Sequence, residues 1–204
     1  RFWVSNEQMT DEELVERIRA GEHELFSILM ERHRRRMYRA IRGIVRRESE
    51  TEDALQQTYL NAYAHLHQFA GRSKFSTWLL RIAVHEALDR ARGENEFERG
   101  VVVSAAGQHV LEIEDSGPDP ERAAFGRELQ RLIETEILKL DPLYRAVFML
   151  REVEGLNTAE TAECLNVSIA VVRTRLLRAR AMLRERLLKH AGVSMGSLFN
   201  LLGP

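Results

Sequence analysis

Hydrophobic residues recur every three or four positions along two long parts of the chain, which is the spacing of amphipathic helices. In the first part, residues 10–92, the pattern predicts four helices joined by short turns. We expect them at residues 10–20, at 22–47, from a cap within 49–53 to about 66, and at 74–92. Amphipathic helices with such short connections are typical of a helical bundle.

The second part, residues 121–190, resumes the helical spacing. We predict a helix over 121–140, a break at Asp141-Pro142, and further helices beyond it. Residues 93–120, between the two parts, are acidic and interrupted by glycine and proline, which favours a flexible linker. No strand is predicted. The expected fold class is all-α, with two small helical domains joined by this linker, and the apolar tail 191–204 has no predicted role.

Residues 156–184 carry the pattern of a helix-turn-helix. Asn157 or Thr158 can cap the first helix, and Asn166 can adopt the left-handed conformation that ends it. Ser168 can then cap the second helix, while Ala162 is small enough for the two helices to cross closely. In DNA-binding proteins, such a motif presents its second helix to the major groove.

The second helix of this motif has two different faces. A narrow stripe of apolar side chains predicts its buried side: Val172, Leu176, Ala179 and Leu183. The rest of the helix is basic and polar; arginine suits guanine edges or phosphates, and leucine suits a thymine methyl group. The expected DNA contacts are Arg173, Thr174, Arg175, Leu177, Arg178, Arg180 and Arg184.

The charge of the chain is unevenly distributed. A net charge of −1 would by itself argue against a nucleic-acid partner. However, residues 32–47 contain eight arginines and no acidic residue, and residues 168–204 carry a net charge of +6. We interpret 32–47 as a general phosphate-attracting or solvated face. The second basic segment coincides with the helix-turn-helix, and that combination predicts DNA binding.

Motifs of catalysis are not found. No glycine-rich phosphate loop or nucleophile motif is present, so we expect neither an enzyme nor a cofactor. His65 and His67 stand two apart on a predicted helix and do not face each other, which argues against a metal site. The single cysteine, Cys164, fits a reducing cytoplasm, as does the lack of a membrane-spanning run or signal-peptide pattern.

Two further motifs lie in the first part. The run ETEDALQQTYLNAY at 50–63 is followed by HQF at 67–69 and FSTWLLRIA at 75–83. These motifs resemble region 2 of the sigma-70 family, and the helix-turn-helix block resembles region 4. Because the two regions occur in this order with only a linker between them, residues 10–190 resemble the extracytoplasmic-function (ECF) group of sigma factors.

The resemblance implies a chain that binds core RNA polymerase and directs it to promoter DNA. Region 4 would read the minus-35 element, and region 2 would capture the melted minus-10 element. The implied minus-10 contacts are Gln68, Arg72, Ser73, Lys74, Arg81, Arg90 and Arg92. The implied contacts with the clamp helices of the largest polymerase subunit are Glu52, Asp53, Gln56, Gln57 and Tyr59.

The resemblance also implies an anti-sigma factor that sits between the two domains. Two positions depart from the family pattern: Gln57, which is commonly acidic, and His85, where asparagine is frequent. Two other functions remain open on the residues alone. One is a stand-alone helix-turn-helix regulator whose first bundle dimerises or senses a signal. The other, more remote, is a protein-binding helical adaptor.

Overall fold

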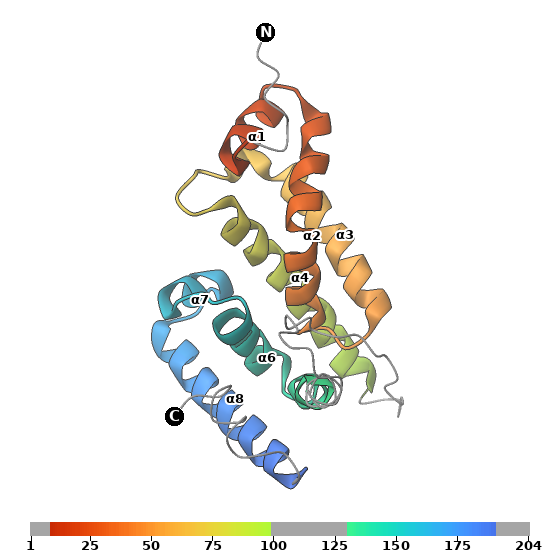
Figure 1. The fold of residues 1–204 in the computed structure, drawn as a ribbon, viewed down its shortest axis with the longest axis vertical. Coiled ribbons are helices and arrows are strands. Elements are labelled where there is room, and N and C mark those ends of the chain that lie inside the picture. The colour runs from red at the N-terminus through yellow and green to blue at the C-terminus, as the bar shows by residue number, and fades with distance from the viewer. Residues whose placement is uncertain (1–8, 99–129, 191–204) are drawn as a thin grey trace, which may run out of the picture.

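A computed structural model describes residues 9–98 and 130–190 (Figure 1). Within these two ranges every regular element is a helix, in agreement with the all-α prediction. Most of the predicted linker 93–120, the predicted helix start at 121 and the whole tail 191–204 lie outside the described residues.

The first range forms a bundle of four α-helices. Helices α2, α3 and α4 pack against one another, and α1 packs against α2 at one end (Figure 1). Single 3-10 turns precede α2 and follow α3. The helices are α1 (Asp11–Arg19), α2 (Phe26–Arg42), α3 (Glu48–Ala64) and α4 (Phe75–Glu98), and the turns are His23–Leu25 and Leu66–Gln68.

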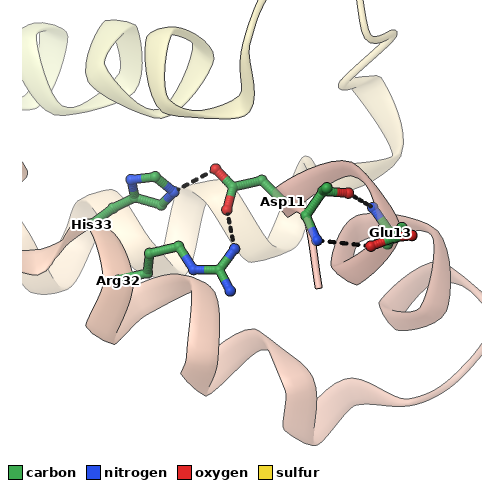
Figure 2. Close-up of polar contacts among 5 residues, drawn as sticks. Asp11, Glu13, Arg32 and His33 are labelled. Atoms are coloured by element: carbon green, nitrogen blue, oxygen red, sulfur yellow. Dashed lines mark hydrogen bonds and ion pairs between the residues drawn. The ribbon is translucent and has the colours of Figure 1, made fainter. Parts of the chain in front are cut away.

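Helix α1 begins with a capping box, shown in Figure 2. The Thr10 hydroxyl accepts a hydrogen bond from the Glu13 backbone N–H (3.2 Å), and the Glu13 carboxylate accepts one from the Thr10 N–H (2.8 Å). Asp11 reaches across to α2, where its two carboxylate oxygens meet Arg32 at 2.6 Å and His33 Nε2 at 2.7 Å. The ion pair with Arg32 and the hydrogen bond with His33 attach α1 to the bundle, a role that the basic run 32–47 did not indicate.

The junction between α2 and α3 differs from the prediction. Helix α2 ends at Arg42 and not at 47, because Ile44 and Val45 turn into the core, where both are fully buried. Arg42 stabilises this turn by donating a hydrogen bond to the Val45 carbonyl (3.1 Å). Helix α3 then begins at Glu48, ahead of the cap expected within 49–53. Helix α4 also continues past the expected end at 92, to Glu98.

The second range contains a helical segment at 130–138 and then four elements. The predicted break at Asp141-Pro142 is confirmed: the Asp141 carboxylate accepts a hydrogen bond from the Leu143 N–H (3.0 Å), and Pro142 takes the first helical position, where its missing N–H is not needed. The elements are α6 (Pro142–Phe148), a π-helical turn (Met149–Val153), α7 (Thr158–Leu165) and α8 (Ile169–Lys189).

The two parts of the chain pack against each other. Helix α4 of the first part contacts both α6 and α7 of the second (Figure 1). Gly43, at the end of α2, lies against the buried Met149 so closely that a Cβ at this position would overlap the methionine side chain. The hydrophobic pattern predicts two domains but contains no signal for this contact between them.

Candidate nucleic-acid interface

The helix-turn-helix forms as predicted. Asn157 and Glu160 make a capping box at the start of α7, with hydrogen bonds of 2.9 and 2.7 Å. Asn166 ends this helix in the left-handed conformation (φ 52°, ψ 49°), and Ser168 caps α8 by accepting a hydrogen bond from the Val171 N–H (3.3 Å). These local interactions fix where the turn begins and ends, and thereby fix the direction of α8.

Helix α8 presents its predicted polar face to solvent. Val172, Ala179 and Leu183 are fully buried, and this stripe orients the opposite face outward. Leu177 is 71% exposed, the largest value among the exposed large apolar side chains of the described residues. Its exposed neighbours on this face are Arg173, Thr174, Arg178 and Arg184. Guanidinium groups, a hydroxyl and an exposed aliphatic side chain are suited to base edges and phosphates.

Two of the predicted DNA contacts on α8, Arg175 and Arg180, are less exposed than the others. Arg180 is half-buried and forms an ion pair with Glu152 of the π-helical turn (2.9 Å). Its guanidinium is therefore directed to another element of the second part of the chain and not to solvent. Arg175 is also half-buried and lines a hollow between α6 and α8, together with Asp141, Tyr144 and Arg178. Arg175 thus lies at the edge of the exposed face and Arg180 behind it.

The loop between α3 and α4 borders a cavity. Gln68, Arg72 and Ser73 are exposed and line it, together with Trp78 and Arg81 of α4. The Trp78 ring packs against Phe69 and against Phe75 with centroid distances of 5.6 Å in both cases. Since Phe75 is only 1% exposed, it belongs to the core, whereas the half-buried Trp78 forms part of the cavity wall.

Arg19 holds the start of this loop in place. Its guanidinium donates hydrogen bonds to the carbonyls of Leu66 and Phe69, which lie almost fifty residues away in the chain. The sequence pattern placed Arg19 only at the end of a short surface helix. No local signal could have identified it, because the contact arises when α1 folds against the bundle.

The other predicted minus-10 residues do not line the cavity. Lys74 is exposed directly before α4, outside the cavity wall. Arg90 and Arg92 lie further along α4, roughly 14–16 Å from Arg81 at 1.5 Å per residue. Arg92 forms an exposed ion pair with Asp89 (3.1 Å). The structure therefore brings together Gln68, Arg72, Ser73 and Arg81 and leaves the other three apart.

Helix α3 carries an exposed stripe along the bundle. Glu52, Asp53 and Gln56 are exposed as expected, and the stripe continues over Leu60 (57% exposed) and Tyr63 (43% exposed). The helical spacing of apolar residues in this segment predicts Tyr63 on the core side of α3. It lies instead at the margin, where its ring packs edge-on against Phe26 while its other side faces solvent. The stripe thus combines acidic, amide and apolar groups.

Gln57 and Tyr59 lie beside this stripe and are partly engaged. The Gln57 amide donates a hydrogen bond to Asn61 Oδ1 (3.1 Å). The Tyr59 hydroxyl donates to the Met30 carbonyl (3.0 Å), and burial raises the pKa of Tyr59 to about 12. Tyr59 consequently anchors α3 to α2 and offers little surface to a partner.

The far wall of the cavity comes from the second part of the chain. Glu160, Glu163 and the buried Cys164 of α7 face the loop across it. Burial raises the pKa of Cys164 to about 12, so the thiol stays protonated and packs as a small apolar residue.

Comparison with known proteins gives two family matches in the order found above. Residues 29–96 match the family model described as sigma-70 region 2, and residues 130–183 match sigma-70 region 4. An ECF RNA polymerase sigma-E factor of Haemophilus influenzae is 30% identical over 188 residues, which cover 89% of this chain and 97% of that protein. The chain belongs to the ECF group of the sigma-70 family. It is a promoter-directing sigma factor, and the stand-alone regulator is not favoured.

Other relatives agree with this assignment. The ECF sigma factor SigW of Bacillus subtilis is 30% identical, with 88% of this sigma factor and 98% of that protein covered. An RNA polymerase sigma-H factor of Pseudomonas aeruginosa is 32% identical, with 88% and 95% covered. Both matches extend over nearly the whole relative, so regions 2 and 4 occur together in each comparison.

Solved structures share the fold. CnrH, solved in complex with the cytosolic domain of CnrY, has a TM-score of 0.61 at 24% identity and covers 89% of this chain and 99% of its own. The sigma factor RpoE of Bartonella quintana, solved in complex with the anti-sigma factor NepR, has a TM-score of 0.61 at 20% identity, with 79% and 96% covered. Figure 1 can therefore be read as region 2 followed by region 4.

Across residues 9–98 and 130–190, no three side chains of the metal-binding types come together in a cluster. Among the helices in that part of the chain, none has an apolar stretch long enough to cross a bilayer.

Proposed function

We propose that α8 reads the minus-35 element through Arg173, Thr174, Leu177 and Arg178. The proposal is supported by the exposure of these side chains along one face, while the opposite stripe is fully buried. Arg175 and Arg184, at the margins of the face, then contact phosphates, which lie outside the base edges on either side of a major-groove helix. Arg180 can contact a DNA phosphate only if its ion pair with Glu152 breaks.

We further propose that the α3–α4 loop captures the melted minus-10 strand. The single observation that carries this proposal is the cavity lined by Gln68, Arg72, Ser73, Trp78 and Arg81. A base turned out of the stack needs a pocket with a flat aromatic wall and hydrogen-bond donors, and its phosphates need nearby cations. Lys74 adds charge at the rim, and Arg90 with Arg92 extends the basic track along α4.

Core RNA polymerase is proposed to bind the stripe on α3. Glu52, Asp53 and Gln56 offer carboxylate and amide groups, and the exposed Leu60 and Tyr63 add apolar area further along the helix. A helical partner with basic and apolar side chains, as proposed for the clamp helices of the largest subunit, would match this surface. Gln57 would contribute at the edge, and Tyr59 indirectly by fixing α3.

Run-off transcription with purified core polymerase on a promoter library tests the proposal as a whole. We expect transcripts only when the sigma factor is added, and we expect Arg81→Ala to retain polymerase binding while losing most open complexes. Glu52→Ala combined with Leu60→Ala should instead weaken polymerase binding itself. No initiation with any core enzyme, together with tight operator binding by the protein alone, would contradict the assignment.

An anti-sigma partner is also proposed. Two structural neighbours were solved with partner proteins, the cytosolic domain of CnrY and the anti-sigma factor NepR. For this sigma factor we expect a partner that binds between regions 2 and 4 in the resting cell. Co-purification from the native host should recover it, and a constitutively active protein that never yields a partner would contradict the expectation.

A further inference from the structure

Helix α1 precedes the segment that matches the family model. The match to sigma-70 region 2 begins at residue 29, whereas α1 spans Asp11–Arg19. Among the described residues, the side chains that line the cavity proposed for the minus-10 strand all come from other elements. Figure 1 nevertheless shows α1 beside the end of α3, where the α3–α4 loop begins. Helix α1 contacts the elements that carry the cavity at two points, one at each of its ends.

At the C-terminal end of α1, Arg19 joins two carbonyl groups of the loop. Its Nη2 atom donates hydrogen bonds to the carbonyl oxygens of both Leu66 and Phe69. Its Nε atom donates to the Leu66 carbonyl as well (3.2 Å). The guanidinium is planar and its donors have a fixed geometry, so the two carbonyls are held at a defined separation. Arg19 thereby fixes both the beginning of the 3-10 turn and the residue that follows it.

Phe69 connects this support to the wall of the cavity. Its buried side chain packs on the rings of Phe75 and Trp78, with centroid distances of 5.6 Å in both cases. Its backbone leads from the 3-10 turn into the loop, where Arg72 and Ser73 line the cavity. A shift of the Phe69 backbone would therefore move both the ring against which Trp78 packs and the hydrogen-bond donors that follow in the loop.

At the N-terminal end of α1, Asp11 reaches the same aromatic cluster through His33. One carboxylate oxygen of Asp11 lies 2.7 Å from His33 Nε2 on α2, and the other accepts a hydrogen bond from Arg32 at 2.6 Å (Figure 2). The His33 ring packs on the ring of Phe75 with a centroid distance of 5.6 Å. Helix α1 is thus attached to the cluster of Phe69, Phe75 and Trp78 from two directions, through a backbone carbonyl and through a histidine ring.

The contact made by Arg19 affects the order of the loop more than the stability of the bundle. Arg19 is exposed, so water can hydrate the two carbonyls when the guanidinium is absent. Exchanging such a hydrogen bond for one with water changes the free energy of unfolding only modestly. Separate water molecules do not fix the distance between the Leu66 and Phe69 carbonyls, however. A loop without Arg19 is freer to move, and ordering it around a base costs binding free energy.

We propose that Arg19 is a positioning residue for minus-10 capture, and that α1 holds the loop and its aromatic wall in the shape that accepts an unstacked base. The proposal rests on the minus-10 role proposed for the cavity. A preorganised pocket discriminates between bases because a wrong base cannot reshape it, whereas a mobile loop adapts to several. Arg19 itself contacts neither DNA nor polymerase and acts through the Phe69 carbonyl.

Binding of premelted promoter probes by the polymerase holoenzyme tests the role of Arg19. Each probe has a single-stranded minus-10 segment, one with the bases preferred in the run-off library and one with those bases replaced. We expect Arg19→Ala to lower the ratio of the two affinities about tenfold, because the loop no longer rejects the wrong bases. Binding to core polymerase should not change. The matched control is Arg17→Ala, which removes the same charge from the last turn of α1 but pairs with Glu22 and not with the loop.

Two conservative variants separate positioning from folding. Arg19→Gln keeps an amide donor near the position of Nε, which faces Leu66, and leaves the Phe69 carbonyl without its donor. Its affinity ratio should fall toward that of Arg19→Ala. Arg19→Lys brings a cationic donor within reach of both carbonyls, and it should restore most of the ratio. Thermal unfolding of all variants, followed by circular dichroism, shows that each is folded at the temperature of the binding assay.

Three results would overturn the positioning role of Arg19: a wild-type affinity ratio in Arg19→Ala, an equal fall in Arg17→Ala, or no recovery in Arg19→Lys. The proposed function fails in a different way. If the unaltered sigma factor shows no preference between the two probes, the minus-10 role of the cavity is itself wrong, and the role of Arg19 is wrong with it. A preference that the unaltered protein shows and Arg19→Ala retains contradicts the role of Arg19 alone.

Discussion

At the residue scale, promoter contact depends on a few side chains of α8 whose exposure is set by their neighbours. Arg178 and Leu177 are adjacent on the exposed face, whereas Arg180, two positions further, turns to Glu152. Residue type alone does not distinguish Arg178 from Arg180. The difference is that Arg180 lies within ion-pair distance of Glu152 in the folded chain. The number of arginines on a helix therefore overestimates how many of them are available to DNA.

Arg178→Ala should reduce promoter binding by the polymerase holoenzyme about tenfold to a hundredfold, because a well-placed arginine contact with a base contributes about 1–3 kcal/mol of discrimination. The loss should be largest on the preferred minus-35 sequence and small on a scrambled one. Lys189→Ala is the control, since Lys189 is exposed on the same helix and pairs with Glu185. Equal losses for both variants would show that Arg178 contributes general charge only. Binding titrations at one fixed salt concentration measure this difference.

At the element scale, the turn of region 4 is specified by local chemistry. Asn157, Asn166 and Ser168 each stabilise one helix end by an interaction within four residues, and such interactions can be recognised from sequence. The α2–α3 junction is different. Ile44 and Val45 continue the helical spacing of α2 in sequence, but they lie beyond the end of the helix, where both side chains are fully buried in the core.

Asn166→Val should lower the free energy of unfolding by about 1–2 kcal/mol, because the left-handed conformation is unfavourable for residues with a β-branched side chain. Asn166→Gly should leave stability almost unchanged, since glycine adopts positive φ without strain. Urea or thermal denaturation of the two variants gives the comparison. If valine and glycine at this position had equal effects, the backbone explanation for the turn would be wrong.

At the scale of the whole molecule, regions 2 and 4 share a packed interface, and Gly43 lies against Met149 within it. Gly43→Ala keeps an ordinary helical φ, so the backbone favours alanine, but the added methyl group overlaps the buried methionine. We expect a destabilisation of about 1–3 kcal/mol, the range found when a packed core is overfilled. Thermal unfolding of the single variants and of Gly43→Ala with Met149→Ala should give a favourable coupling energy.

If the destabilisations of Gly43→Ala and Met149→Ala simply add in the double variant, the two residues are not in contact in solution, which would contradict this interface. The coupling has a direct physical reading: in the Met149→Ala background the methyl group that Gly43→Ala adds fills space that the shorter side chain vacates, and its cost falls. Since Gly43 and Met149 belong to different regions, a measured coupling reports on the packing of region 2 against region 4 without DNA or polymerase.

The sequence by itself determined the elements and the family of this sigma factor. Helical periodicity, caps at Thr10, Asn157 and Ser168, and the motifs at 50–83 depend on residues close together in the chain, so they can be read without a structure. The exposed face of α8 follows from the same periodicity, because a buried stripe leaves only one side for DNA.

Tertiary structure alone decided how these elements meet. Arg19 supports the loop of the cavity, Glu160 and Glu163 line its far side, and Glu154 joins Arg36 and Arg39 across the two regions. Each of these contacts joins residues that are about fifty or more positions apart. The sequence around a charged residue does not indicate which distant residue it will pair with. Which carboxylate pairs across the two regions and which stays solvated depends on packing that only the folded chain defines.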